Sequence, residues 1–189
     1  MTTKRGRGRS YIIDELDGFR NEDVARAAAY LDELRERVFD QIKDLPQDAL
    51  DFEAGETKLS IGRLGLHLGW GELSWMKKLS AQTVQNTDDL STALAPGSLK
   101  LFKEPPPKTE AAKGIVALCR RVRNEVTIPV LQGVEDFDES RVEDGSTVRG
   151  VITHLQWHWV YHSGHIGLIS FEWGSDYEWT MAGPLVTRP

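Results

Sequence analysis

The sequence predicts an all-α fold: a four-helix bundle with a long loop between its second and third helices. Three observations support this prediction. Apolar residues recur at helical spacing in four long segments, and Ser-, Gly- and Pro-rich stretches separate these segments. No internal repeat and no convincing period-two alternation of strands is found. A chain of 189 residues, 40% of them hydrophobic, is also large enough to bury a single core.

Two helices are predicted in the first half of the chain. The first runs from about Asn21 to Leu45 and stops before Pro46, since proline cannot continue a helix. The residues on its apolar face are Val24, Ala28, Leu31, Leu34, Val38 and Ile42. The second helix opens near Ser60, and its apolar residues, which again recur at helical spacing, are Ile61, Leu64, Leu68, Trp75 and Leu79.

The segment from Thr83 to Pro107 is predicted as a long loop, because Ser, Thr, Asp, Gly and Pro are frequent in it. The third helix begins near Thr109, and Pro129 is expected to bend or end it. The inward-facing residues of this helix are Ile115, Leu118, Val122 and Val126. A loop of this length can cross the end of a bundle, so simple up-down topology does not follow from the sequence.

The fourth helix is predicted to follow the motif Asp144-Gly145-Ser146 and to run to about Gly174. β-Branched and aromatic residues are numerous between Ile152 and Ile169, so a strand is the competing interpretation. The length of the segment and the four-residue spacing of its histidines favour a helix. We therefore expect a disordered basic tip over 1–15, the bundle over 16–174 and a C-terminal tail over 175–189.

Charge and composition argue against several classes of function. The first ten residues include Lys4, Arg5, Arg7 and Arg9, yet the whole chain carries a formal charge of −6. Such an acidic body argues against a nucleic-acid-binding surface, and the basic tip is interpreted as a solvated terminus. No apolar run approaches the roughly 20 residues of a membrane span, and the basic start lacks the apolar stretch of a secretory signal. The single cysteine, Cys119, is interpreted as a buried core residue and indicates a reducing cytoplasm.

The histidines are clustered. Four of the five fall within twelve residues, namely His154, His158, His162 and His165. On a helix they lie at about 0°, 40°, 80° and 20° around the axis, so they form one stripe. Two histidines four residues apart can bind one cation, but a third ligand must come from elsewhere, and His67 is the only histidine left to provide it.

Three neutral imidazoles are suitable ligands for zinc, with nickel or iron as alternatives, and they leave coordination positions for water or substrate. A metal in such a site lowers the pKa of a bound water or thiol and so produces a nucleophile. The alternative is a set of buried histidines whose hydrogen bonds are satisfied without a metal. No other motif competes, since the sequence has no HExxH, CxxC, Walker loop or GxGxxG. A di-iron bundle is also disfavoured, because no glutamate precedes His158 or His162 by three residues.

Two motifs resemble those of the DinB/YfiT-like superfamily of metal-binding four-helix bundles. The first is Ser60-Ile61-x-x-Leu64-x-x-His67-Leu68-x-x-x-Glu72-x-x-Trp75, and the second is His154-Leu155-x-x-His158-x-x-x-His162-x-Gly164-x-Ile166. They occur in the expected order, and the resemblance covers the helical pattern but not the tail after Gly174. It implies that the metal ligands are His67, His158 and His162. At position 165 this chain has histidine, where many members have glutamine.

The resemblance further implies a cytoplasmic, often dimeric protein that binds a divalent metal. Some relatives use low-molecular-weight thiols such as bacillithiol, mycothiol or glutathione. We therefore expect a homodimeric, metal-dependent enzyme that transfers such a thiol to a small electrophile, with no nucleic-acid or membrane partner. His165 or Glu72 is expected to move protons as a catalytic residue, although Glu72 could instead be solvated or capping. Trp157 and Tyr161 flank the histidine stripe and are expected to form the walls of a pocket.

Three alternatives use the same histidines. A metal-dependent hydrolase would activate water at the open position. A non-catalytic, stress-associated metal- or ligand-binding dimer would close the coordination sphere with a fourth protein ligand, His154 or His165. The third alternative is a site that binds no metal at cellular concentrations.

Overall fold

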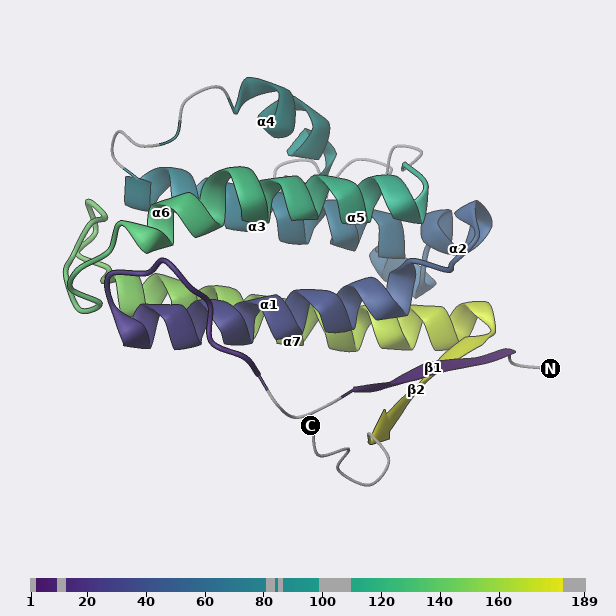
Figure 1. Cartoon of the computed structure of the whole chain (residues 1–189). Coiled ribbons are helices and arrows are strands. Elements are labelled where there is room, and N and C mark those ends of the chain that lie inside the picture. Colours follow the sequence, from purple (N-terminus) through teal and green to yellow (C-terminus); the bar gives the residue numbers. More distant parts are fainter. Residues whose placement is uncertain (1–2, 10–12, 81–83, 85–86, 99–109, 182–189) are drawn as a thin grey trace.

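A computed structural model describes residues 3–9, 13–80, 84, 87–98 and 110–181 of the chain. Its long helices are α1 (Glu22–Ile42), α3 (Ile61–Ser80) and α7 (Val148–Trp173), together with α5 (Ala112–Arg121), which continues through a π-helical turn, η4 (Val122–Thr127), into α6 (Ile128–Gln132). In Figure 1, α3 lies with α5 and α6 in one layer, and α1 lies with α7 in the other. The predicted all-α fold is therefore confirmed.

Shorter elements connect the long helices. They are α2 (Gln47–Asp51), the 3₁₀ turn η1 (Gly55–Thr57), α4 (Asp88–Leu94) and the 3₁₀ turn η2 (Ala95–Gly97). Both α4 and η2 fall inside the segment predicted as a loop, because Leu90 and Leu94 are fully buried and anchor a short helix there. The rest of that predicted loop lies largely outside the described residues.

Local chemistry explains where α1 begins and where α7 begins and ends. The side chain of Asn21 accepts hydrogen bonds from the backbone N–H groups of Asp23 and Val24, which caps α1. Thr147 caps α7 in the same way by accepting from the N–H of Gly150. The helix ends at Gly174, whose φ of 105° is the left-handed conformation that glycine adopts most easily. The segment from Ile152 to Ile169 is thus helix, and the competing strand interpretation is wrong.

Pro129 was expected either to bend or to end the third helix. It does not end it, because the helical run that begins at Ala112 continues beyond Pro129. Proline lacks a backbone N–H, so it cannot make the hydrogen bond of an interior helical residue. Here Pro129 lies in the first turn of α6, directly after the π-helical turn, and the chain remains helical to Gln132. The sequence thus indicated that the helix is irregular near Pro129, but it did not predict the π-helical turn.

Two short strands were not predicted. β1 (Thr3–Arg9) pairs in parallel with β2 (Ser175–Met181), in a register that runs from Thr3 opposite Ser175 to Arg9 opposite Met181. The segment 3–9 is therefore a strand, rather than part of the disordered tip expected over 1–15. In β2, Tyr177, Trp179 and Met181 alternate with polar residues, which is typical of a strand. β1 contains no apolar residue, so its pairing with β2 could not be read from periodicity. Residues 182–189 of the expected tail lie outside the described residues.

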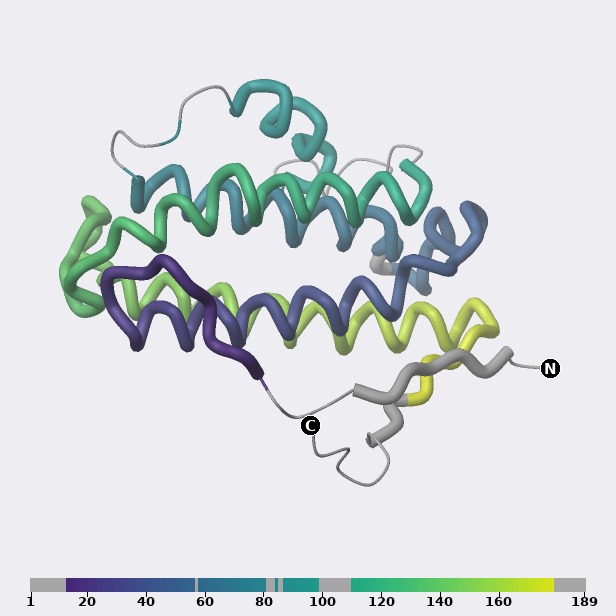
Figure 2. Tube along the Cα trace, viewed as in Figure 1, coloured from purple at the N-terminus to yellow at the C-terminus, as the bar shows by residue number. Residues whose placement is uncertain are grey.

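Helix α3 lies at the centre of the contacts that position the site. It packs against α2, α4, η2, α5, η4 and α7, and most of its residues are buried. Figure 2 shows α1 and α7, from opposite ends of the chain, running side by side, and they are also in direct contact. Among the described residues, no helix combines the length and apolarity needed to cross a bilayer.

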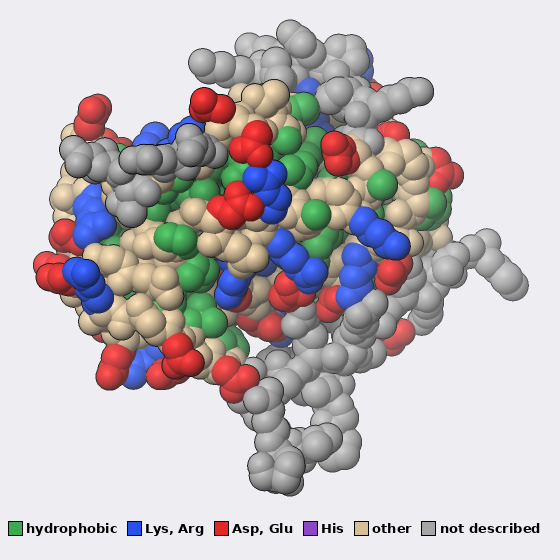
Figure 3. All heavy atoms as spheres, turned by 45° about the horizontal axis from the view of Figure 1, so that its top comes forward, with side chains coloured by type: hydrophobic (Ala, Val, Ile, Leu, Met, Phe, Trp, Pro, Cys, Tyr) green, Lys and Arg blue, Asp and Glu red, His purple; other side chains and the backbone are tan. Residues whose placement is uncertain are grey.

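Charges of both signs are interspersed on the face shown in Figure 3. The described residues include exposed ion pairs, such as Arg121 with both Asp89 and Glu125, and Arg120 with Glu36. Exposed pairs of this kind contribute little to the free energy of unfolding, about 0–1 kcal/mol each. The bundle is therefore stabilised mainly by its apolar core, to which every long helix contributes.

Candidate metal centre

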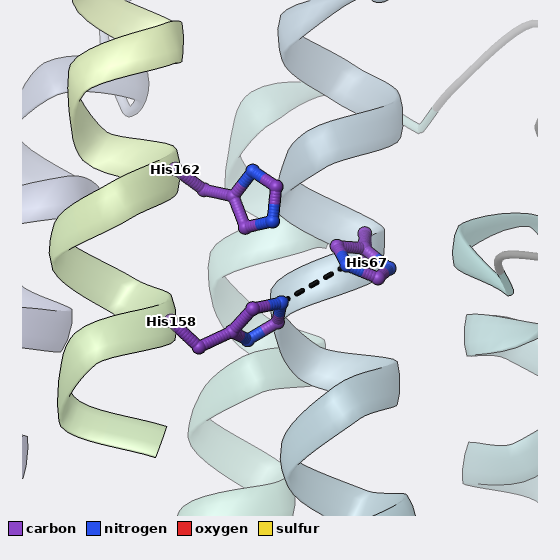
Figure 4. A group of neighbouring side chains, drawn as sticks. All are labelled: His67, His158 and His162. Atoms are coloured by element: carbon purple, nitrogen blue, oxygen red, sulfur yellow. Dashed lines mark hydrogen bonds between the residues drawn. The ribbon is translucent and has the colours of Figure 1, made fainter. Parts of the chain in front are cut away.

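Three histidines converge between α3 and α7. His67 is on α3, and His158 and His162 are on successive turns of α7 (Figure 4). One ring nitrogen from each lies within 4.8 Å of the others, and the Nε2 atoms of His67 and His158 are 3.0 Å apart. The three side chains are buried, at 4%, 8% and 9% exposure. The structure thus brings together the three residues that the sequence motifs indicated.

Two features of the sequence produce this convergence. A spacing of four residues places His158 and His162 on the same face of α7, which packs directly against α3. On α3, Gly71 lies one turn after His67 and leaves room for the facing ring. A Cβ atom at position 71 would be 3.0 Å from Cε1 of His158, so even alanine would press on the ring.

The ring of His67 is oriented by η2. Its Nδ1 lies 2.8 Å from the carbonyl oxygen of Gly97, and because a carbonyl can only accept, Nδ1 must carry the hydrogen. The Nε2 atom of His67 therefore keeps its lone pair and faces the other two histidines. Sequence reasoning missed Gly97, which lies in the segment predicted as a loop. A glycine immediately after proline is its only visible signal, and that pair marks a turn rather than a site.

Gly97 must be glycine for this contact to form. A Cβ atom there would lie 2.4 Å from the backbone nitrogen of His67 and 2.4 Å from the carbonyl carbon of Leu66. These are backbone atoms inside a helix and cannot move aside. The absence of a side chain therefore lets η2 approach α3 closely enough to hold His67.

The buried cluster favours uncharged imidazoles. Burial, followed by the neighbouring histidines, lowers the pKa of His158 to about 3 and that of His162 to about 4. Burial also lowers the pKa of His67, although its hydrogen bond to Gly97 opposes the effect. At neutral pH the three rings are therefore neutral, which is the state that binds a metal.

Three imidazole nitrogens form a donor set that suits a divalent metal. Nδ1 of His158 is buried and has no hydrogen-bond partner among the described residues. Leaving a buried polar atom unpaired costs about 1–3 kcal/mol in the free energy of folding. The three rings therefore do not form a hydrogen-bond network in which every nitrogen has a partner. Two nitrogens at about 2.0–2.1 Å from a tetrahedral metal lie about 3.3 Å apart, close to the 3.0 Å separation between His67 and His158.

The other two histidines of the stripe lie outside this group. His154 is exposed, and its ring contacts Trp75, with centroids 5.4 Å apart, and Trp157. His165 is half-buried, with its Nδ1 3.3 Å from Nδ1 of His162. That contact uses Nδ1 of His162 and leaves its Nε2 for the cluster. Among the described residues, the group that could hold a metal thus consists of three histidines without a fourth ligand.

Glu72 is buried, so the expectation of a solvated side chain is wrong. It is 1% exposed, and its two oxygens accept hydrogen bonds from Arg35, Thr127 and Trp159. Arg35 binds it in a bidentate manner, at 2.9 Å from Nε and 2.6 Å from Nη2, and also pairs with Asp32. These contacts join α1, α3, η4 and α7 behind the histidines. The sequence signal was Arg35 on the apolar side of the first helix, since a buried arginine requires a carboxylate partner.

A cavity of about 340 Å³ opens beside the three histidines. Its walls are formed by Trp70 and Trp75 from α3 and by Trp157 and Tyr161 from α7, so the predicted role of Trp157 and Tyr161 is confirmed. A small molecule could therefore reach a metal held by His67, His158 and His162. A second cavity, of about 370 Å³ and lined by residues such as Lys78 and Arg141, contains none of the histidines.

The fold and the site together define a class: a helical bundle that can bind a metal between facing helices through three histidines. A sequence model of the DinB family matches residues 20–182, a range that includes all three histidines. The chain therefore belongs to the DinB family, as its two motifs predicted. Among curated proteins, none matches the chain.

Proposed function

We propose that this chain is a metal-dependent enzyme that transfers a low-molecular-weight thiol to a small electrophile. The observation that supports the proposal is a group of three neutral histidines with one side facing a cavity. Three nitrogen ligands leave a position for an exogenous sulfur, whereas a structural site would be closed by a fourth protein ligand. We propose zinc as the metal, with nickel or iron as alternatives.

The residues have separate roles in this proposal. His67, His158 and His162 hold the metal, which when bound keeps the thiol sulfur as a thiolate. In the transfer, the thiol loses its S–H proton and sulfur forms a bond to the electrophilic carbon. The bond from that carbon to the leaving group breaks, and the leaving group departs with its electron pair. His165, in contact with His162, is proposed to receive the proton.

Glu72 is assigned a positioning role rather than that of a base. Both of its oxygens are occupied by donors from Arg35, Thr127 and Trp159. Trp159 directly follows His158 on α7, so this group of contacts fixes α7, and with it the ligands, against α3. A cytoplasmic location is part of the proposal, because free thiols persist in a reducing compartment.

The proposal is tested with protein purified without added metal. Elemental analysis gives the bound metal, and a thiol panel of bacillithiol, mycothiol, glutathione and cysteine is then assayed with a model electrophile. We expect thioether formation that requires the metal and is lost in His158→Ala, while Thr153→Ala, an exposed change on the same helix, retains it. Activity that survives chelation or His158→Ala would contradict the proposal.

The same cavity also fits a metal-dependent hydrolase, because water could take the position proposed for sulfur. Hydrolysis of a model ester without any thiol would favour that function. A non-catalytic, stress-associated metal-binding protein would need a closed coordination sphere, and neither His154 nor His165 belongs to the metal-binding group. Coordination numbers from X-ray absorption would distinguish that alternative.

We also propose that the protein is a homodimer that pairs through α7. From 150 to 171 this helix has no Lys, Arg, Asp or Glu, and it exposes apolar side chains that are not part of the cavity lining, namely Val160, Leu168 and Phe171. The chain has a formal charge of −6, so two copies would repel over most of their surface but not over this uncharged face. Exposed apolar surface of this kind is typical of an interface.

A further inference from the structure

The cavity beside the histidines has aromatic walls formed in advance. On α7, the rings of Trp157 and Tyr161 stack with their centroids 4.9 Å apart and their planes 20° apart. On α3, the ring of Trp70 stacks with that of His67, at 6.2 Å and 19°. Flat aromatic surfaces thus lie on both sides of the opening, and one of them, the ring of Trp70, stacks on the predicted metal ligand His67.

These aromatic rings remain partly exposed. Trp157 is 56% exposed and Tyr161 48% exposed, although aromatic side chains gain more free energy from burial than any others. A molecule that covered the two rings would remove this apolar surface from water. The exposed aromatic surface is therefore best explained as a binding surface.

No acidic side chain and no lysine or arginine lines this cavity among the described residues. The lining consists of His67, Trp70, Gly71, Trp75, His154, Trp157, His158, Tyr161 and His162. Lys78 lies nearby, but its Nζ is 4.2 Å from the centre of the Trp75 ring and is occupied by that contact. A charged ligand would lose its hydration without gaining an ion pair.

We propose that this cavity binds a flat, uncharged aromatic molecule, with its ring against Trp157 and Tyr161 and its edge toward the histidines. The inference rests on the proposed function, because this molecule would be the electrophile that accepts the thiol. A charged ligand is disfavoured, since no carboxylate, lysine or arginine lines the cavity among the described residues. The volume of about 340 Å³, near the lower end of the usual range, limits the ligand to a small molecule.

The test compares two ligands with one carbon skeleton. 2-Naphthol is flat and aromatic, whereas decahydro-2-naphthol is saturated and puckered. Calorimetric titration is carried out with the full chain, both free of metal and loaded with zinc. We expect 2-naphthol to bind at least tenfold more tightly than the saturated alcohol to both forms. Trp157→Leu and Tyr161→Leu should each remove most of that difference, because leucine keeps the apolar character but not the flat face.

Tyr30→Leu is the matched control, since Tyr30 is a similarly exposed tyrosine, 43% exposed, on α1 and outside the cavity. This variant should keep the full preference. Equal binding of the two alcohols, no binding of either, or a preference that survives Trp157→Leu would overturn the inference. A (2-naphthyl)trimethylammonium ion that bound as tightly as 2-naphthol would overturn the requirement for an uncharged ligand. The metal-free titration separates the two proposals, because a preference found there stands even if the protein proves to bind no metal.

Discussion

The Nδ1 atom of His67 donates a hydrogen bond of 2.8 Å to the carbonyl oxygen of Gly97. This bond fixes which ring nitrogen of His67 faces the other histidines. It also makes a short 3₁₀ turn, in a segment without helical periodicity, part of the candidate metal centre. Loss of the hydrogen bond that a metal-binding histidine donates through its other ring nitrogen typically lowers metal affinity by about 10–100-fold.

The first prediction concerns Gly97→Ala. The added Cβ atom would clash with the backbone of α3 at 2.4 Å, so η2 must move away and the hydrogen bond to His67 is lost. We expect zinc affinity to fall by about 10–100-fold, measured by competition with a chromophoric chelator. Gly167→Ala is the control, because no atom lies within 4 Å of a Cβ there. Unchanged affinity in a folded Gly97→Ala protein would show that this bond does not orient the ligand.

The second prediction concerns the choice of ligands. His67→Ala and His162→Ala should reduce the bound metal to a similar extent, because each removes one of three ligands. His154→Ala should retain the metal, since His154 lies outside the group. Elemental analysis of each purified variant measures the stoichiometry. Full metal content in His67→Ala, together with loss in His154→Ala or His165→Ala, would show that the ligand set is wrong.

The three candidate ligands could be predicted because their signals are local. Helical periodicity defined α3 and α7, and the four-residue spacing placed His158 and His162 on one face. His67 followed from counting, since the chain has five histidines and four of them are in the stripe. The resemblance to the family then selected two members of the stripe, which spacing alone could not do.

The parts that could not be predicted depend on contacts between distant segments. Every residue has a backbone carbonyl, so nothing in the sequence marks that of Gly97 as the acceptor for His67. The environment of Glu72 depends on how Arg35 and Thr127 pack against it from two other helices. Strand β1 contains no apolar residue, so nothing in its own sequence marks the pairing with β2.

The third prediction tests the role of Glu72. Glu72→Gln removes the more deeply buried of the two carboxylates that pair with Arg35, whose side chain is 2% exposed. Breaking a buried ion pair costs about 3–5 kcal/mol, so we expect a loss of that order in the free energy of unfolding, measured with urea. Glu36→Gln, in an exposed pair with Arg120, should cost at most about 1 kcal/mol. Unchanged stability with a large loss of kcat would instead identify Glu72 as a base.

The fourth prediction tests the dimer. Leu168 is 71% exposed on the uncharged face of α7, and a buried carboxylate without a partner is strongly unfavourable in an interface. We expect Leu168→Glu to convert the dimer to a monomer in analytical ultracentrifugation. Tyr30→Glu places the same charge on an exposed apolar position of α1 and should leave the dimer intact. A wild-type protein that sediments as a monomer would contradict this part of the proposal.

The last prediction concerns the pH dependence of stability in the metal-free protein. In the unfolded chain a histidine binds a proton near pH 6.5, whereas in the folded protein burial holds the pKa of His158 at about 3 and that of His162 at about 4. Between these values the unfolded state binds more protons, so the free energy of unfolding must fall as the pH falls from about 6.5 toward 3.

Carboxylates also titrate over part of this range, so the contribution of the histidines is isolated with the double variant His158→Gln, His162→Gln. The side chain of glutamine does not bind a proton in this pH range. The fall in the free energy of unfolding between pH 6.5 and 4 should therefore be smaller in the variant than in the wild type. Urea unfolding at several pH values measures both slopes, with metal removed from both proteins. Equal slopes would show that the two imidazoles are not kept neutral by burial, and the physical argument for their readiness to bind a metal at neutral pH would then lose its basis.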